Sequence, residues 1–485
     1  MLENVQPVKV MSFFEKICSI PHGSGNTKAI SDYCVNFAES RGFWVRQDEM
    51  NNVVIVKEAS EGYEQAPTLM IQGHLDMVCE KNGDVDFDFE KEGLRLQTKG
   101  DFVYAEGTTL GGDDGIAVAC ALAILDDDTI KHPRLEVIFT TEEEVGMEGA
   151  LALDMSDLRG EYLINIDSEE EGKILTSCAG GMRSDIKFHM KPWAMDGICV
   201  KLTIRGLLGG HSGTEIDKRR ANANVILGRA LYELNKMVNF GVASVNGGAK
   251  DNAIPREAQA VICVPEDAVD TMHQMMTKFI SDIRNEYKTS DPGLEIVVEC
   301  TEAVRDFGVF SPDSFQRVLF VWFNAPNGIQ SMSADLEGLV ESSLNLGIIS
   351  TVGDTVALRY SVRSSVKSLK WYISDKLEYL TEMMGGDYSF EGEYPEWEYK
   401  KDSSLRALAS DVFESMYGKT PELEAIHAGL ECGLFHEKKP ELDMISIGPD
   451  IFDIHTPQER LSISSTQRTY AYLMKMLEQF PKYCK

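Results

Sequence analysis

The sequence predicts an α/β protein with a catalytic domain, whose mixed, mostly parallel sheet lies between helices, and an inserted α+β lid domain. Near both ends of the chain, short apolar runs alternate with stretches of helical spacing, which is typical of a parallel sheet covered by helices. Between them, alternating strands are interleaved with amphipathic helices, which is typical of a separate α+β layer. We therefore expect residues 1–182 and 394–485 to form the catalytic domain and residues 183–393 to form the insertion.

The catalytic segments have a regular order of expected elements. Helical spacing predicts helices at 8–20 and 27–41, and the apolar run 116–125 predicts a buried helix after the loop LGGDDG. Apolar runs bounded by Gly or polar residues predict strands at 53–56, 69–71, 135–139, 162–166 and 444–447. Four of these strands are followed by acidic residues or histidine, and the carboxyl ends of strands are where open α/β sheets place their sites.

The insertion has a different pattern of apolar and polar residues. Alternating apolar residues predict strands at 199–204, 258–264, 294–300 and 355–362. Amphipathic spacing predicts helices at 217–236, 266–288 and 367–384. No internal repeat, low-complexity tract or flexible linker is visible in the sequence, so the insertion reads as one domain.

Composition limits the classes of function. A chain of 485 residues with 43% hydrophobic and 26% charged residues is expected to form about two to four globular domains. A formal charge of -31 argues against binding to nucleic acid or to an anionic membrane surface. Ten cysteines without a CxxC pair indicate reduced thiols. The longest apolar run, 116–125, is about half as long as a membrane span requires, and no signal-peptide core is visible. We expect a cytoplasmic protein with neither a nucleic-acid nor a membrane partner.

Histidines and carboxylates follow the expected strands. His74 and Asp76 follow the second strand, the run Glu142–Glu144 follows the third, Asp167 follows the fourth, and His455 follows the last. Each has a plain structural alternative when taken alone: a hydrogen-bonded histidine at a strand end, or a solvated run of charge. Asp113 and Asp114 could equally be acidic residues at a helix N-terminus, where the dipole favours negative charge.

Taken together, these residues suggest metal chemistry. The set His74, Asp113, Glu144, Asp167 and His455 has two imidazoles, three carboxylates and no cysteine, which suits catalytic zinc and also manganese or cobalt. The ratio fits two metal ions that share one bridging carboxylate. Glu143 is the natural proton carrier because it adjoins this set without being needed as a ligand. Asp76 can hold the second ring nitrogen of His74.

The motifs GHLDMV, TTLGGDDG, EEEVG, NIDSEEEG and HTPQE stand in the order and spacing of a known family. The chain resembles the co-catalytic di-zinc exopeptidases, which include carnosinases, tripeptidases and acylamino acid deacylases. The segments IPHGSG, SCAGG, GGHSG, ANAN and IHAGLECGLF extend the resemblance over essentially the whole length. The resemblance implies two zinc ions per subunit, which manganese or cobalt could replace, a lid domain, and a homodimer.

The resemblance also implies a role for each matching residue of the metal site. Asp113 would bridge the two ions, and Asp114 would be a neighbour at the helix start. His74 and Asp167 would complete one ion, and Glu144 and His455 would complete the other. Asp76 would orient the His74 imidazole, and Glu143 would be the general base.

In the lid, the resemblance implies that His211 stabilises the oxyanion of the tetrahedral intermediate. Asn252 and Arg363 match lid positions that contact substrate, and Gly429 matches a main-chain contact from the catalytic domain. An arginine suits a terminal carboxylate because its planar fork binds both oxygens. By residue type alone, Arg363 could equally form a surface ion pair and Gly429 a turn. His427, near Gly429, is expected to be structural.

The activity implied is hydrolysis of small peptides. Within the family, the pattern is most similar to dipeptidases that prefer a C-terminal histidine. A tripeptidase or an N-acyl amino acid deacylase would use the same metals and stays open as an alternative. A non-catalytic metal-binding or peptide-binding protein on the same fold is the alternative from another class.

Overall fold

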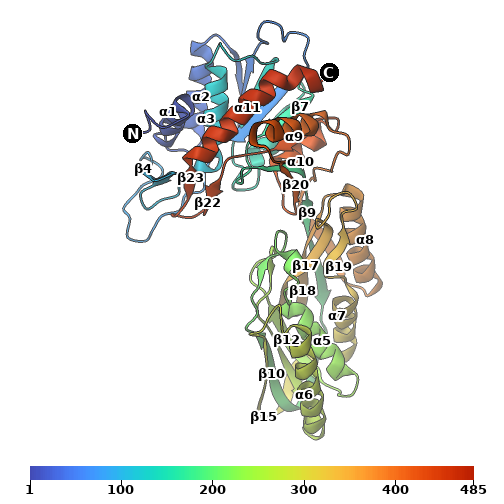
Figure 1. Cartoon of the computed structure of the whole chain (residues 1–485). Coiled ribbons are helices and arrows are strands. Elements are labelled where there is room, and N and C mark those ends of the chain that lie inside the picture. The colour runs from blue at the N-terminus through green and yellow to red at the C-terminus, as the bar shows by residue number, and fades with distance from the viewer. The chain divides into compact units, whose positions relative to one another are not determined.

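The protein, described by a computed structural model over residues 1–485, divides into two compact units (Figure 1). Unit 1 comprises Met1–Ser177, Tyr399–Ala425 and Leu430–Lys485, and unit 2 comprises Cys178–Glu398 and Ile426–Gly429. The expected boundaries were at 182/183 and 393/394, and the short second segment of unit 2 was not expected. No helix combines the length and the apolar character that a membrane span needs.

Unit 1 is built on an eight-stranded sheet. In sheet order its strands are β1 (Trp44–Gln47), β2 (Val53–Lys57), β6 (Leu135–Thr140), β3 (Leu69–His74), β7 (Tyr162–Asn165), β21 (Asp443–Ser446), β8 (Lys173–Cys178) and β20 (Glu422–Ile426). The central strands β6, β3, β7 and β21 run parallel, whereas β1 and β2 on one side and β8 on the other pair antiparallel. The mixed α/β fold predicted from the sequence is confirmed.

Helices cover both faces of this sheet. One face shares a single apolar core with α1 (Val8–Cys18), α2 (Lys28–Ser40), α3 (Gly112–Leu125), α9 (Ser404–Tyr417) and α11 (Ile463–Tyr483). The other face is approached by α4 (Glu148–Ala152) and α10 (Glu431–Lys438), whose first residue reaches Gln72 on β3. Helix α3 is apolar on all sides, and every residue from Gly115 to Leu125 is accordingly buried.

Unit 1 also contains a small antiparallel sheet, which joins strands from its first and last chain segments. Its order is β22 (Ile451–Phe452), β23 (Arg460–Ser462), β5 (Phe102–Ala105) and β4 (Leu96–Lys99). Because β23 pairs with β5, the segment that carries His455 is tied to the segment just before α3. In Figure 1 this red C-terminal hairpin lies beside the start of α11.

Unit 2 is a nine-stranded antiparallel sheet with one layer of helices. The path through the sheet is β15 (Glu295–Phe310), β10 (Pro192–Arg205), β14 (Ala258–Val264), β12 (Gly241–Gly247), β17 (Val340–Val352), β18 (Thr355–Ser364), β9 (Gly180–His189) and β19 (Asp387–Tyr394), with β16 (Gly328–Met332) beside β17. One apolar core joins one face of this sheet to α5 (Ala223–Asn235), α6 (Val269–Glu286), α7 (Pro312–Asn324) and α8 (Lys367–Met383). A two-stranded ribbon, β11 (Gly210–His211) with β13 (Ala253–Ile254), stands outside it.

The sheet of unit 2 contains a topological duplication. One half runs β10, α5, β12, β14, α6, β15, and the other runs β9, α7, β17, β18, α8, β19, with the first half inserted after β9. From the central β12–β17 pair outward, each half places its second, third, first and fourth strands in that order. The sequence analysis found no repeat, because the halves share an order of elements but not residues or lengths.

The predicted elements correspond to observed ones with altered lengths. The helix expected at 217–236 begins only at Ala223, where the Asn222 side chain accepts the N–H of Val225 as an N-cap. The strand expected at 199–204 extends over Pro192–Arg205, because a register shift lets it continue past Gly197. Helices α7, α9, α10 and α11 were not predicted.

Candidate metal centre and active site

The carboxyl ends of the parallel strands bring the predicted ligands together in unit 1. His74 is the last residue of β3, Glu144 follows β6, and Asp167 follows β7. His455 comes shortly after β21 and the short strand β22 in the chain, and Asp113 lies at the start of α3. All five predicted metal ligands therefore meet at one edge of the sheet, the position where open α/β sheets hold their ligands.

Asp113 lies between the two histidines. Its Oδ1 atom is 3.1 Å from Nε2 of His74, and its Oδ2 atom is 3.2 Å from Nε2 of His455. One carboxylate thus presents a separate oxygen to each imidazole. This is the arrangement that a carboxylate bridging two metal ions requires.

Each histidine also faces a second carboxylate. His74 Nε2 is 3.6 Å from Oδ1 of Asp167, and His455 Nε2 is 3.0 Å from Oε2 of Glu144. Nitrogen and oxygen donors that converge without thiolate fit zinc, manganese or cobalt. The residues present therefore fit a pair of such ions.

Ligand atoms of His74, Asp113 and Glu144 lie within 4.8 Å of one another, and so do ligand atoms of His74, Asp114 and Asp167. Both aspartates are therefore near enough to His74 to share an ion with it. We favour Asp113, because Oδ2 of Asp114 already accepts the main-chain N–H of His74 at 3.1 Å. Burial raises the pKa of Asp114 well above its usual range, and the charge of Asp167 adds to the shift. A Cβ atom on Gly73 would lie 2.5 Å from this carboxylate, which explains the glycine before His74.

The charges of the site depend on one another. Burial alone would lower the pKa of His74, but hydrogen bonds to Asp113 and Asp167 raise it well above its usual value. Hydrogen bonds to Asp113 and Glu144 raise the pKa of His455 to about 10. Burial raises the pKa of Asp167 to about 6, and His74 opposes the shift. Three carboxylates at one point require positive charge, which bound cations would supply directly.

Asp76 connects the histidine strand to the glutamate loop. Nδ1 of His74 lies 2.9 Å from the main-chain oxygen of Asp76 and 3.6 Å from its carboxylate, so the carbonyl is the hydrogen-bond acceptor. The carboxylate accepts the main-chain N–H groups of Glu143 at 3.1 Å and Glu144 at 3.3 Å. It also accepts the Ser24 hydroxyl at 2.8 Å. The expected orienting contact to His74 thus comes from the main chain, and the carboxylate fixes the next loop.

The Glu143 carboxyl has the raised pKa that a proton carrier needs. Burial raises the pKa of its carboxyl well above the usual range, while the charge of His74 opposes the shift. A glutamate near metal-bound water needs such a raised pKa to take and return a proton near neutral pH. The preceding Glu142 turns away, because its carboxylate accepts the N–H of Gly25 at 2.9 Å.

Three positioning residues were not assigned by the sequence analysis. The buried Glu459 accepts the main-chain N–H groups of Leu110 and Gly112, both at 2.7 Å, and so fixes the loop that carries Asp113. Two features of the sequence could have identified Glu459. It ends the motif HTPQE, and the glycine-rich loop before α3 has main-chain N–H groups that need an acceptor. Ser24, from IPHGSG, holds Asp76.

Glu431 is the third missed residue. It is fully buried, and its Oε2 atom accepts the Gln72 amide at 2.5 Å and the Thr140 hydroxyl at 2.8 Å. Burial raises its pKa to about 8. It therefore supports the ends of β3 and β6 from the face opposite the main core. Only its place in the motif IHAGLECGLF pointed to it.

The four predicted substrate-binding residues all belong to unit 2. His211 lies on β11 and pairs with Ala253, next to Asn252, whose main-chain oxygen accepts the N–H of Ser212 at 2.9 Å. Arg363 is buried on β18. Gly429 ends the Ile426–Gly429 segment.

Gly213 marks the point where two of these side chains and the main chain of His427 approach one another. A Cβ atom built there would lie 2.4 Å from the main-chain oxygen of His427, 3.0 Å from Cε1 of His211 and 3.1 Å from Nε of Arg363. Burial lowers the pKa of His427 to about 3, and the charge of Arg363 adds to the shift. The structure thus brings His211 and Arg363 together, with a neutral His427 beside them.

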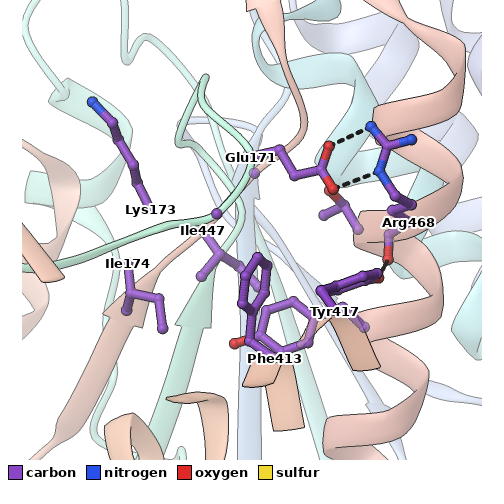
Figure 2. A pocket seen from close by; sticks show the side chains of 11 residues that line it. Glu171, Lys173, Ile174, Phe413, Tyr417, Ile447 and Arg468 are labelled. Carbon is purple, nitrogen blue, oxygen red and sulfur yellow. Dashed lines mark hydrogen bonds and ion pairs between the residues drawn. The ribbon is translucent and has the colours of Figure 1, made fainter. Parts of the chain in front are cut away.

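A partly open hollow elsewhere in unit 1 is too small for a substrate. It lies between β8, α9 and α11, and its volume of about 10 Å³ corresponds to one water molecule (Figure 2). Glu171 and Arg468 close one side through a bidentate ion pair at 2.6 and 2.7 Å. We therefore regard it as a packing feature of the fold.

An α/β fold with this nitrogen and oxygen donor set at the strand ends defines a metal-dependent hydrolase. The chain belongs to the peptidase family M20/M25/M40, whose family model matches residues 70–479. The family resemblance and the metallopeptidase class predicted from the sequence are therefore confirmed.

Two relatives match essentially the whole chain. The cytosol non-specific dipeptidase of Escherichia coli (strain K12) is 38% identical over 484 residues, which are 99% of each protein. The structure of aminoacylhistidine dipeptidase from Vibrio alginolyticus matches with a TM-score of 0.94 at 37% identity, over 99% of this chain and 98% of that one. A tripeptidase from Staphylococcus aureus shares the fold, with a TM-score of 0.56 at 15% identity over 99% of both chains.

Proposed function

We propose that this protein is a dinuclear metal dipeptidase that prefers dipeptides with a C-terminal histidine. The observation that carries the proposal is the position of Asp113, whose two oxygens face His74 and His455 at 3.1 and 3.2 Å. A site for a single ion would not need one carboxylate shared between two imidazoles. In this assignment His74 and Asp167 complete one ion, and Glu144 and His455 complete the other.

The chemistry proposed for the chain's own residues is acid–base and electrostatic. Two ions in the site would polarise the scissile carbonyl and lower the pKa of the attacking water. Glu143 takes the proton from that water and returns it to the departing amine. His211 is proposed as the donor to the oxyanion, and its neutral imidazole suits this role because burial, followed by the charge of Arg363, lowers its pKa.

We propose zinc as the metal and a free carboxylate as the feature of the substrate that unit 2 binds. Zinc agrees with ligands that include two histidines, although the same donors accept manganese or cobalt. Arg363 supports the carboxylate assignment, because it is buried and its Nε atom has no hydrogen-bond partner. Asn252 and Gly429 are proposed as further substrate contacts, and unit 2 as the lid.

The names of the two relatives differ in their statement of specificity. One is called a non-specific dipeptidase and the other an aminoacylhistidine dipeptidase, at 38% and 37% identity to this chain. Both names support dipeptides as the substrate class. We therefore expect several dipeptides to be cleaved and those ending in histidine to be cleaved with the highest kcat/KM.

We also propose that the enzyme acts in the cytoplasm as a homodimer. The word cytosol in the name of the Escherichia coli relative supports the location. Light scattering on the purified, metal-loaded protein tests the dimer. A mass close to the 54.0 kDa of one chain would contradict it.

Hydrolysis of a matched set of substrates tests the function. The set is glycyl-histidine, β-alanyl-histidine, glycyl-leucine, glycyl-glycyl-leucine and acetyl-leucine, each with the zinc-loaded and the metal-stripped protein. We expect dipeptide hydrolysis that depends on metal and is fastest for the histidyl compounds. Faster cleavage of the tripeptide or of acetyl-leucine would replace the dipeptidase assignment, and metal binding without hydrolysis of any compound would contradict catalysis.

A further inference from the structure

The polar environment of Arg363 within unit 2 is incomplete. Its NH1 atom donates to the Tyr394 hydroxyl at 2.6 Å, its Nε atom has no partner, and no carboxylate of the protein pairs with it. A buried guanidinium without a counter-charge is costly unless a ligand supplies the charge. His211 and His427 add no charge, because burial lowers the pKa of both. The site is therefore suited to a single monoanion.

The Tyr394 hydroxyl has a proton to offer. It accepts the hydrogen bond from Arg363, and Arg363 is its one hydrogen-bond partner. A hydroxyl carries one donor in addition to its acceptor capacity, so its proton remains unused within the protein. Burial raises the pKa of Tyr394, so the hydroxyl stays protonated at neutral pH.

The surrounding structure holds Tyr394 in this position. The buried Lys370 donates to the main-chain oxygen of Tyr394 at 2.9 Å and to the carboxylate of Glu393 at 2.6 Å. Gly181, directly opposite Tyr394 on β9, makes room for the ring, since a Cβ atom there would lie 2.5 Å from the hydroxyl oxygen. This requirement accounts for the second glycine of the SCAGG motif, to which the proposed function assigned no role.

We propose that Tyr394 is a substrate-binding residue whose hydroxyl donates to one oxygen of the substrate's terminal carboxylate while Arg363 binds the other. The inference rests on the proposed function, in which Arg363 receives that carboxylate. It adds a second donor, from β19, and predicts that both donors act on the same group. A hydrogen bond to a charged group is worth enough that its loss weakens binding by about tenfold or more.

Steady-state kinetics with glycyl-leucine test the inference on the full-length, zinc-loaded protein. We expect Tyr394→Phe to raise KM by about tenfold and to change kcat by less than about twofold, because the hydroxyl acts on the carboxylate and not on the reacting atoms. Tyr388→Phe is the matched control, since this tyrosine of the same strand bonds to Ser184 and Ser374 and not to Arg363. Its KM should stay unchanged.

Gly181→Ala provides a second, independent variant. The added methyl group displaces the Tyr394 hydroxyl, so KM should rise in the same direction while Tyr394 itself is retained. In the double variant Tyr394→Phe with Arg363→Met, the rise in KM should be smaller than the product of the two single rises, because Arg363 also holds the Tyr394 hydroxyl in place.

The outcomes separate this inference from the function on which it rests. An unchanged KM in Arg363→Met would overturn the carboxylate site itself, and the role of Tyr394 with it. A raised KM in Arg363→Met together with an unchanged KM in Tyr394→Phe would overturn only the inference. An equal rise in Tyr388→Phe would also overturn it, because the effect would then be a general one of strand β19.

Discussion

The carboxylate of Asp76 accepts the main-chain N–H of Glu143, with 3.1 Å between Oδ1 and N. This contact links the residue after the histidine strand to the proposed general base. The replacement Asp76→Asn keeps one oxygen and turns an NH₂ group toward N–H donors, so at least one contact is lost. We expect kcat to fall by about 10- to 100-fold, as for other supporting residues of metal sites. Steady-state kinetics on protein of measured zinc content provide the test.

Ser24→Ala separates the two roles of Asp76. The variant removes the 2.8 Å hydrogen bond to the Asp76 carboxylate but leaves the main-chain contact to His74. We therefore expect a smaller loss of kcat with full zinc content. Loss of zinc in this variant would show that the Asp76 carboxylate also supports the metal ligands.

Glu143→Gln should abolish most turnover without loss of metal. Glutamine cannot carry the proton, and general acid–base catalysis contributes about 10²- to 10⁴-fold to rates. Glu142→Gln is the matched control, because the Glu142 side chain bonds to the main chain of Gly25. It should retain kcat within about tenfold. Near-normal turnover in Glu143→Gln would refute the assigned base, and loss of zinc would make Glu143 a ligand.

The sequence predicted those site residues whose positions follow from a local pattern of apolar and polar residues. An apolar strand that ends in a polar residue predicts a side chain at the sheet edge, and this principle placed His74 and Asp167 correctly. The predicted helix start left Asp113 and Asp114 equivalent as acidic residues at a helix N-terminus, and the family resemblance chose Asp113 as the ligand. The contact of Asp114 to the His74 main chain supports that choice.

Contacts between distant segments could not be predicted from pattern. Glu459 bonds to Gly112 across 347 positions, and nothing local to either residue indicates the other. The same applies to the duplication in unit 2, which is a property of strand order rather than of residues. The predicted strand at 294–300 was also shorter than β15, because the middle of β15, residues 299–306, is largely polar and exposed.

Glu459→Gln should weaken metal binding although Glu459 is not a proposed ligand. Its two oxygens accept the N–H groups of Leu110, Gly111 and Gly112 at 2.7, 3.1 and 2.7 Å, and an amide can satisfy only one side of this loop. We expect zinc affinity to fall by about 10- to 100-fold. Competition with a zinc chelator measures it. The exposed neighbour Gln458 gives the control variant Gln458→Ala, and equal affinities of all three proteins would contradict the prediction.

Metal counting tests the assignment of ligands to two ions. After dialysis against metal-free buffer, the parent protein should retain two zinc ions per chain, measured by plasma mass spectrometry. His455→Ala should retain one, because His455 contacts Asp113 and Glu144 but not Asp167. Asp113→Ala should retain none, since its oxygens face both histidines. One zinc ion per chain in the parent protein would contradict the dinuclear site.

Acid should destabilise the protein partly through His427. Its pKa is about 3 in the folded protein against 6.5 for an ordinary histidine, because burial and then Arg363 disfavour the charged ring. The unfolded chain therefore binds a proton that the folded chain refuses, and this contribution to stability is present above pH 6.5 and is lost as the pH falls toward 3. Through this histidine alone, the free energy of unfolding changes with pH by up to about 1.4 kcal/mol per pH unit. Urea midpoints of metal-stripped protein between pH 7.5 and 4.5 should fall less steeply for His427→Gln than for the parent. Parallel curves would show that His427 takes up its proton equally in both states.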